Sequence, residues 1–182
     1  MKGKFRHIYG VITVFDAVTP KHYVSIVTDR DAQSSGAGTF SLTNVKQSSY
    51  SGAFPIPITF QVTWQAGDKL GWDQRRRWTG GTIVGDYTVP VAERIPDALL
   101  DEIRANGGAL RLKIRLIDDG VLIGWDTEKR IPFKDSGPAA TGRYLKYVMS
   151  GGDFREAQKS DGKIIERGWY IDKNGKKTWT DG

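Results

Sequence analysis

The sequence predicts a single α+β domain over residues 1–182, mostly antiparallel β-structure with one or two short helices. Two observations lead to this fold class. Segments in which apolar and polar residues alternate recur along the chain, as they do in half-buried strands. One segment, residues 95–108, instead places apolar residues at helical spacing. We therefore expect six or more strands in a twisted sheet or sandwich, with a helix covering part of one face.

The first half of the chain is expected to supply several of these strands. Residues 5–15 and 22–28 are rich in aromatic and β-branched side chains and are expected to pair with each other. The small and polar residues of 29–49 indicate a long loop or a weak edge strand. Apolar residues alternate through 56–64, and two prolines place the start of that strand at a sheet edge. Residues 82–91 should direct four side chains to one side: Ile83, Tyr87, Val89 and Val91.

The expected helix has recognisable ends. Pro96 stands near its start, acidic residues occupy its early turns, and Gly107 stands where a left-handed cap is favoured. Leu99, Leu100 and Ile103 form a narrow apolar stripe. A helix of about ten residues is marginal alone in water, so we expect it to rest on a sheet.

A hairpin is predicted within residues 109–130, with Asp119-Gly120 as its two-residue turn. This register places apolar residues opposite each other on the inner side and opposite charges on the outer side, and each such pair is stabilising. A slip of one residue would break all of these pairs. The expected partners are Ile114 with Trp125 and Leu116 with Ile123 inside, and Lys113 with Asp126 and Arg111 with Glu128 outside.

The C-terminal part of the chain predicts a second hairpin, which could be peripheral to the domain. Asn174-Gly175 is typical of a type I′ turn, and residues 163–180 would then pair with Tyr170 opposite Trp179. For residues 134–162 the pattern leaves two structures open, because "GRYLKYVM" fits either a helical turn or another strand.

Composition excludes several classes of function. The net charge is +6, but residues 1–90 carry 10 basic and 6 acidic side chains and residues 91–182 carry 17 and 15. The excess is spread thinly, whereas nucleic-acid-binding domains usually concentrate it on one face. The absence of cysteine excludes disulfides, thiolate catalysis and the usual structural zinc sites. Residues 47–67 are uncharged, but their prolines and alternation indicate a strand rather than a membrane helix. We expect no cofactor and no metal.

Candidate catalytic residues are few. His7 and His22, the only histidines, lie in strand patterns, and the G-x-S-x-G serine motif is absent. A hydrolase site assembled in space around His22 is an alternative hypothesis. Two pairs of carboxylates could hold a hard cation, but aspartate also favours turns and polar loops, and that is the interpretation preferred here. The pairs are Asp29 with Asp31 and Asp118 with Asp119.

The segment "GWDQRRRWTGG", residues 71–81, is the predicted functional site. Arg75, Arg76 and Arg77 stand between Trp72 and Trp78, on a connection expected to project beyond the sheet. Tryptophan and arginine are the residue types most enriched at the energetic centres of protein interfaces. These five residues are therefore the predicted partner-binding residues. The alternatives are a loop that binds nucleic acid or an anionic surface, and a solvated loop without function.

The order of the motifs resembles that of a known family. "PIPITFQVTW", "GDYTVPVAERIPDALLDEI", a charged hairpin ending in "GWD", and a late "GGDF" follow one another between residues 8 and 155. This layout is similar to a family of small lipoproteins of unknown function from Gram-negative bacteria. Some relatives are encoded beside type VI secretion effectors, including lipases, and are regarded as their immunity proteins. The lipidated N-terminal cysteine of the family is absent here.

The resemblance implies a non-enzymatic protein that neutralises a cognate effector by occluding its active site. It also implies a periplasmic location, with tethering to the outer or inner membrane through an N-terminal lipid anchor that this chain does not carry. Without that anchor and leader, the expected location is cytoplasmic. The family has no motif that defines binding residues, so the nomination of residues 72–78 rests on residue chemistry alone.

Overall fold

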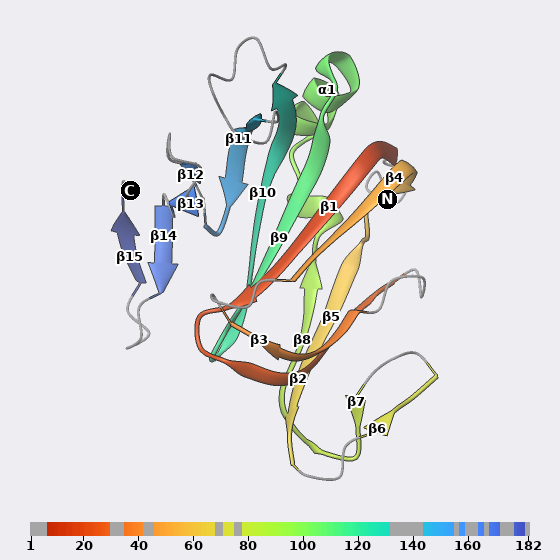
Figure 1. The fold of residues 1–182 in the computed structure, drawn as a ribbon, viewed down its shortest axis with the longest axis vertical. Helices are drawn as coiled ribbons and strands as arrows, with labels where there is room; N and C mark the ends of the chain where they lie inside the picture. Colours follow the sequence, from red (N-terminus) through yellow and green to blue (C-terminus); the bar gives the residue numbers. More distant parts are fainter. Residues whose placement is uncertain are drawn as a thin grey trace.

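Two main β-sheets with a common core form the body of the protein, which confirms the α+β, mostly antiparallel fold class and the sandwich arrangement (Figure 1). The computed structural model describes residues 7–29, 35–41, 46–67, 71–74, 78–131, 144–154, 157–158, 164–165, 168–171 and 177–180.

The first sheet, here called sheet A, has five strands in the order β11-β10-β9-β1-β4. Neighbouring strands are antiparallel except for β1 and β9, which run parallel, so the sheet is mixed. Its strands are β1 (His7–Ala17), β4 (Lys46–Pro55), β9 (Ala109–Ile117), β10 (Gly120–Ile131) and β11 (Tyr144–Gly152).

The second sheet, sheet B, has four antiparallel strands in the order β3-β2-β5-β8. The polar segment 29–49 supplies an edge strand to each sheet, β3 to sheet B and the start of β4 to sheet A, which confirms the expectation of edge structure there. The strands of sheet B are β2 (Lys21–Thr28), β3 (Ser35–Phe40), β5 (Thr59–Ala66) and β8 (Thr82–Pro90).

Two expectations for the first half of the chain are wrong. The segments 5–15 and 22–28 do not pair, because β1 lies in sheet A and β2 in sheet B. The apolar faces of both strands are buried across the shared core instead of side by side in one sheet. The segment 56–64 does not start at an edge: β4 ends at Pro55, Pro57 lies in the connection, and β5 runs between β2 and β8 without a proline.

The core lies between the sheets and is closed at one end by the helix. Phe15 of β1 stacks on Phe40 of β3 with ring centroids 6.1 Å apart, and meets Phe60 of β5 edge-on at 6.4 Å. Leu99 and Leu100 of the helix belong to the same cluster of buried residues. One continuous core therefore joins both sheets and the helix.

The helix is confirmed where the sequence predicts it. α1 runs from Asp97 to Asn106, with Pro96 as its N-cap and Gly107 at φ 72° after its last residue. The Gly107 amide donates to the carbonyl of Ile103 at 2.9 Å and so satisfies one of the last carbonyls of the helix. α1 contacts β1, β9 and β10 at one end of sheet A (Figure 1). A 3-10 turn, η2 (Ala92–Arg94), precedes it.

The β9–β10 hairpin is present, but its predicted register is wrong by two residues. Gly120 pairs with Ile117, so Asp118-Asp119 forms the turn. No left-handed residue occurs in this turn, so it does not use the backbone conformation that Asp-Gly favours. Because the shift is an even number of residues, the inner and outer faces stay as predicted while every partner changes. The observed pairs include Ile114 with Ile123, Leu116 with Val121, Arg111 with Asp126, and Lys113 with Gly124.

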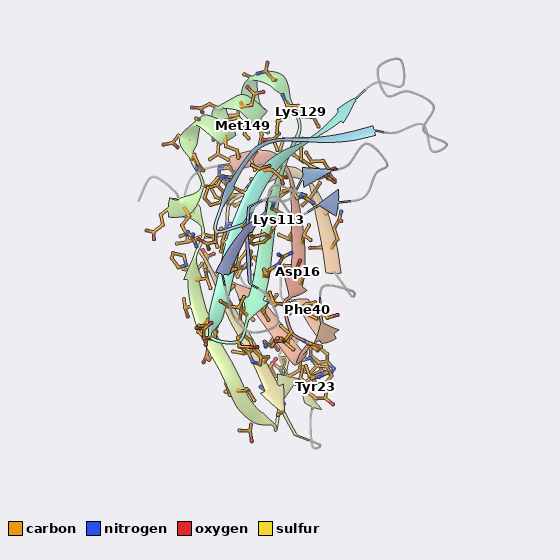
Figure 2. The ribbon with its side chains drawn as sticks, turned by 90° about the vertical axis from the view of Figure 1, so that its left-hand side faces the viewer. Asp16, Tyr23, Phe40, Lys113, Lys129 and Met149 are labelled. Atoms are coloured by element: carbon orange, nitrogen blue, oxygen red, sulfur yellow. The ribbon has the colours of Figure 1, made fainter. Side chains whose placement is uncertain are left out.

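The outer face of β9 is buried, although it carries charge. Arg111 donates to both oxygens of Asp126, at 3.0 and 2.9 Å, and Lys113 Nζ lies 3.2 Å from Asp126 Oδ2 as an ion pair. Arg115 makes the same two-bonded contact with Asp16 of β1, at 2.8 Å for each bond. The guanidinium of Arg115 and the ammonium of Lys113 also lie 4.5 and 5.2 Å from the Phe154 ring. Figure 2 shows Lys113 and Asp16 on neighbouring strands in the middle of the molecule.

In the C-terminal part, the open alternative for "GRYLKYVM" is settled in favour of a strand, β11. The second hairpin exists as β14 (Gly168–Ile171) paired with β15 (Lys177–Thr180), but in its backbone register Tyr170 pairs with Thr178 and Trp169 with Trp179. The predicted pair is thus wrong by one residue, and the Asn174-Gly175 turn lies outside the described residues. A further two-stranded sheet joins β12 (Ala157–Gln158) to β13 (Ile164–Ile165).

Among the described residues, no helix has the length and apolar character needed to cross a membrane.

Candidate functional site

An aromatic cluster lies at the end of the molecule opposite α1. Trp72 and Trp78 are cross-strand partners in the short hairpin of β6 (Gly71–Trp72) and β7 (Trp78–Thr79), with ring centroids 3.9 Å apart. Tyr23 of β2 packs edge-on against Trp78 at 5.0 Å. Trp72 is 50% exposed and Trp78 is half-buried. We call Tyr23, Trp72 and Trp78 the aromatic tip; Figure 2 labels Tyr23 at this end.

The backbone of Trp78 is attached to sheet B through two buried polar side chains. Its amide donates to Ser25 Oγ of β2 at 2.9 Å, and its carbonyl accepts from Gln65 Nε2 of β5 at 2.7 Å. Ser25 and Gln65 are 1% and 8% exposed. Because both main-chain polar groups of Trp78 are satisfied by the sheet, the tip has a defined position relative to the scaffold.

Tyr23 adopts an uncommon backbone conformation. Its φ is 50°, in the left-handed region that bulky residues rarely enter. Such a conformation costs about 1–3 kcal/mol and persists where the surrounding structure imposes it. In this conformation the Tyr23 ring contacts Trp78 and lies 6.5 Å from the ring of His22. Strain of this kind is enriched at functional sites, which is consistent with a binding role for the tip.

A cleft of about 330 Å³ lies beside the tip on the outer face of sheet B. This volume is at the lower end of the range of small-ligand sites. β5 contributes its outward polar residues, with β2 on one side of it and β8 on the other, and the β6–β7 hairpin with the glycines after it contributes the remaining residues. The lining residues are Val27, Gln61, Thr63, Gln65, Asp73, Trp78, Thr79, Gly80, Gly81, Ile83 and Asp86.

A bulge in β8 shapes one wall of this cleft. Trp64 pairs with Gly85 and Gln65 with Ile83, so Val84 is the extra residue. The bulge reverses the faces of the residues before it, and Ile83 is exposed at 56% beside Gln65. The expectation that Ile83 shares a face with Val89 is therefore wrong, because a bulge breaks the alternation on which it depended.

The predicted site residues are brought together in part. The structure places Trp72 and Trp78 in contact, as a joint binding surface requires. Arg75, Arg76 and Arg77 lie outside the described residues, so their role stays a prediction.

The neighbours of the tip and of the cleft carry no local signal in the sequence. Tyr23, Gln65 and Asp86 reach this region from β2, β5 and β8, which lie outside residues 71–81. The polar alternation of β5 was visible in the sequence, but alternation alone does not distinguish a solvated face from a cleft.

The other candidate groups have structural neighbours. The Asp29 carboxylate accepts from the amide of Ile58 at 2.8 Å and so holds the connection into β5. Asp118 accepts from Thr19 Oγ1 at 2.6 Å and from the Lys21 ammonium. His22 is exposed on β2. Within the described ranges, His, Asp and Glu side chains form no group of three that could hold a metal ion.

Two carboxyl groups have shifted pKa values. The hydrogen bond from Lys21, with that from Thr19, lowers the pKa of Asp118 below its ordinary value. The hydrogen bond from Lys129 in β10, with that from Asn106, lowers the pKa of Glu102 in α1. The Lys129–Glu102 contact, at 2.6 Å, ties the helix to sheet A. Neither carboxyl group lines the cleft, so both pKa shifts bear on the free energy of folding and not on binding in the cleft.

Comparison with known proteins gives no further guide to this site. No protein-family model, curated protein or solved structure matches this chain. The resemblance to the lipoprotein family therefore stays a prediction from the order of motifs.

Proposed function

We propose that this chain is a non-enzymatic binding protein that neutralises a secreted antibacterial effector, such as a type VI lipase, by occluding its active site. The observation that carries the binding role is the aromatic tip, in which the exposed Trp72 contacts the half-buried Trp78 and hydrogen bonds hold the Trp78 backbone to the sheet. The effector as partner comes from the resemblance in motif order.

The chemistry of the tip suits a protein interface. Tryptophan is among the residues that most often carry the binding energy of interfaces. A surface that is already ordered loses less conformational entropy when a partner binds. Trp78 meets this condition because Ser25 and Gln65 fix its backbone. Arginines 75–77, next in the chain to these aromatics, would add attraction to an acidic surface and raise the association rate.

In this proposal the protein acts in the periplasm, where a lipid anchor on a longer form would hold it at the outer or inner membrane. A form without leader and anchor would act in the cytoplasm. Fractionation of the native protein from its own cells distinguishes the two locations.

Growth rescue tests the proposed function. The product of the gene adjacent to this one is directed to the periplasm of a host, with and without this chain. Co-expression is expected to restore growth, and the double variant Trp72→Ala/Trp78→Ala is expected to lose the protection. Replacing a residue at the energetic centre of an interface by alanine lowers the binding free energy by about 2 kcal/mol or more, which is roughly 30-fold in affinity.

The matched control is Tyr9→Ala, which removes another exposed aromatic side chain, 73% exposed on β1. Tyr9→Ala should protect like the unmodified chain, and thermal melts should show both variants folded. Protection by the double tryptophan variant equal to that of the unmodified chain would contradict the proposal, as would failure of the unmodified chain to protect.

A second candidate function is favoured by the same aromatic pair. Aromatic side chains on which bases can stack, close in the chain to basic residues, are typical of surfaces that bind single-stranded nucleic acid, and Trp72 and Trp78 flank three arginines in the sequence. Binding of a labelled oligonucleotide measured from low to high salt separates the two functions. Tight binding that weakens steeply with salt supports nucleic acid, whereas a protein interface with an apolar centre depends on salt far less.

A further inference from the structure

The cleft beside the tip has a buried acceptor that lacks a donor. Gln65 Nε2 donates to the carbonyl of Trp78, and a carbonyl can only accept, so the orientation of this amide is determined. Gln65 Oε1 then has no hydrogen-bond partner in the described part of the chain, in a side chain that is 8% exposed. A buried acceptor without a donor is destabilising. A ligand that donates a hydrogen bond here would recover part of that lost stability.

The remaining polar groups of the cleft also favour a donor. The amide of Gln61 lies with Nε2 3.4 Å from Asp86 Oδ1, so its donor side faces a carboxylate of the protein itself. Asp73 and Asp86 both line the cleft, and no basic side chain of the described residues does. The cleft therefore presents negative charge and hydrogen-bond acceptors, while each glutamine amide already directs one of its two N–H groups at a protein acceptor.

We propose that this cleft receives an arginine side chain of the partner protein, an inference that rests on the proposed binding function. A guanidinium is a planar cation with five N–H donors and no acceptor, which matches a lining rich in acceptors. Its flat face packs on aromatic rings, and Trp78 is the aromatic residue among those that line the cleft. Val27 and Ile83 supply apolar contact for the aliphatic part of the side chain.

A saccharide is the main competing ligand, because sugar rings also pack on tryptophan. Sugar hydroxyls act as donors and as acceptors, so they need N–H groups as well as carboxylates. Since each glutamine amide gives one of its two N–H groups to Asp86 or to Trp78 O, and two carboxylates line the cleft, the lining favours the cationic guanidinium. The net charge of +6 does not prevent binding of a cation, because charges beyond about 8 Å are largely screened at physiological salt.

The test uses the full chain labelled with ¹⁵N and three small probes. Nα-acetyl-arginine amide is titrated while the Trp78 indole N–H and the Gln65 side-chain amide are followed by NMR. Nα-acetyl-citrulline amide has the same shape without the charge, and methyl β-glucopyranoside represents a saccharide. The arginine probe is expected to shift both signals to saturation, and the citrulline probe to bind roughly tenfold more weakly because it lacks charge-assisted hydrogen bonds.

Variants locate the site. Asp73→Asn/Asp86→Asn is expected to weaken binding of the arginine probe about fivefold, since the variant removes two partly screened attractions to the guanidinium. The control Asp101→Asn/Asp119→Asn makes the same change of charge at two acids that do not line the cleft, and should leave the affinity unchanged. The folded spectrum of each variant shows that the scaffold is intact.

Three results would overturn the inference. The arginine probe could leave both signals in place, the citrulline probe could bind as tightly, or the glucoside could shift the same signals while arginine does not. The outcome is separable from the proposed function, because growth rescue measures neutralisation directly. Rescue together with a negative arginine titration would show a binding protein whose cleft does not take arginine.

Discussion

Replacing Asp126 by alanine is expected to lower the free energy of unfolding by about 3–5 kcal/mol, the usual cost of removing one partner of a buried ion pair. Asp126 is fully buried and accepts two hydrogen bonds from Arg111, at 3.0 and 2.9 Å. Lys113 Nζ lies 3.2 Å from the same carboxylate. Because Arg111 and Lys113 are only 4% and 1% exposed, water cannot replace the lost counter-charge without rearrangement of the strands.

Urea unfolding followed by tryptophan fluorescence measures this cost. In a thermal melt of a chain of this size, 1 kcal/mol corresponds to about 2–4 °C, so the melting temperature should fall by roughly 6–20 °C. The matched control is Asp101→Ala, which breaks an exposed pair with Arg104 on α1 and should cost less than about 1 kcal/mol. The reasoning is refuted if Asp126→Ala costs no more than this control.

Alanine at Gly85 is expected to cost about 1–3 kcal/mol or more, because its Cβ would lie 2.1 Å from the buried Trp64 ring; an unchanged thermal melt would contradict this. Stability is expected to fall modestly below about pH 4. The pKa of Asp118 is lowered in the folded state by Lys21, so its contribution is present above the unfolded-state pKa and disappears as pH falls through the folded one. Asp118→Asn should reduce this slope in acid unfolding curves, and an unchanged slope would count against it. Alanine at all three of residues 75–77 should leave the melting temperature nearly unchanged, and a large drop would show that these arginines are structural.

Local signals in the sequence were sufficient for the helix and for the existence of the hairpins. Pro96 and Gly107 mark the ends of α1 because proline and glycine have strong, local backbone preferences. The faces of β9 were also predictable from alternation, since an even shift in register leaves them unchanged. The register of the β9–β10 pair was not predictable from the sequence. Asp118-Asp119 forms the turn, and it does so without the left-handed residues that an Asp-Gly turn would contain.

Contacts between distant strands could not be read from local pattern. The parallel pairing of β1 with β9 joins segments about a hundred residues apart, and periodicity carries no information on partners. The burial of Arg111 on the outer face of β9 was not predictable for the same reason, because Tyr147 of β11 reaches its guanidinium from outside the hairpin. The cleft depends on a bulge at Val84, which the alternating pattern of β8 did not reveal.

Both proposals require the aromatic tip to be fixed before a partner arrives. Hydrogen exchange of the Trp78 amide tests this most directly, because that amide donates to Ser25 Oγ rather than to water. We predict protection comparable to that of the β5 amides in sheet B, and its loss in Ser25→Ala. Exchange of the Trp78 amide at the rate of an unstructured peptide would contradict the account.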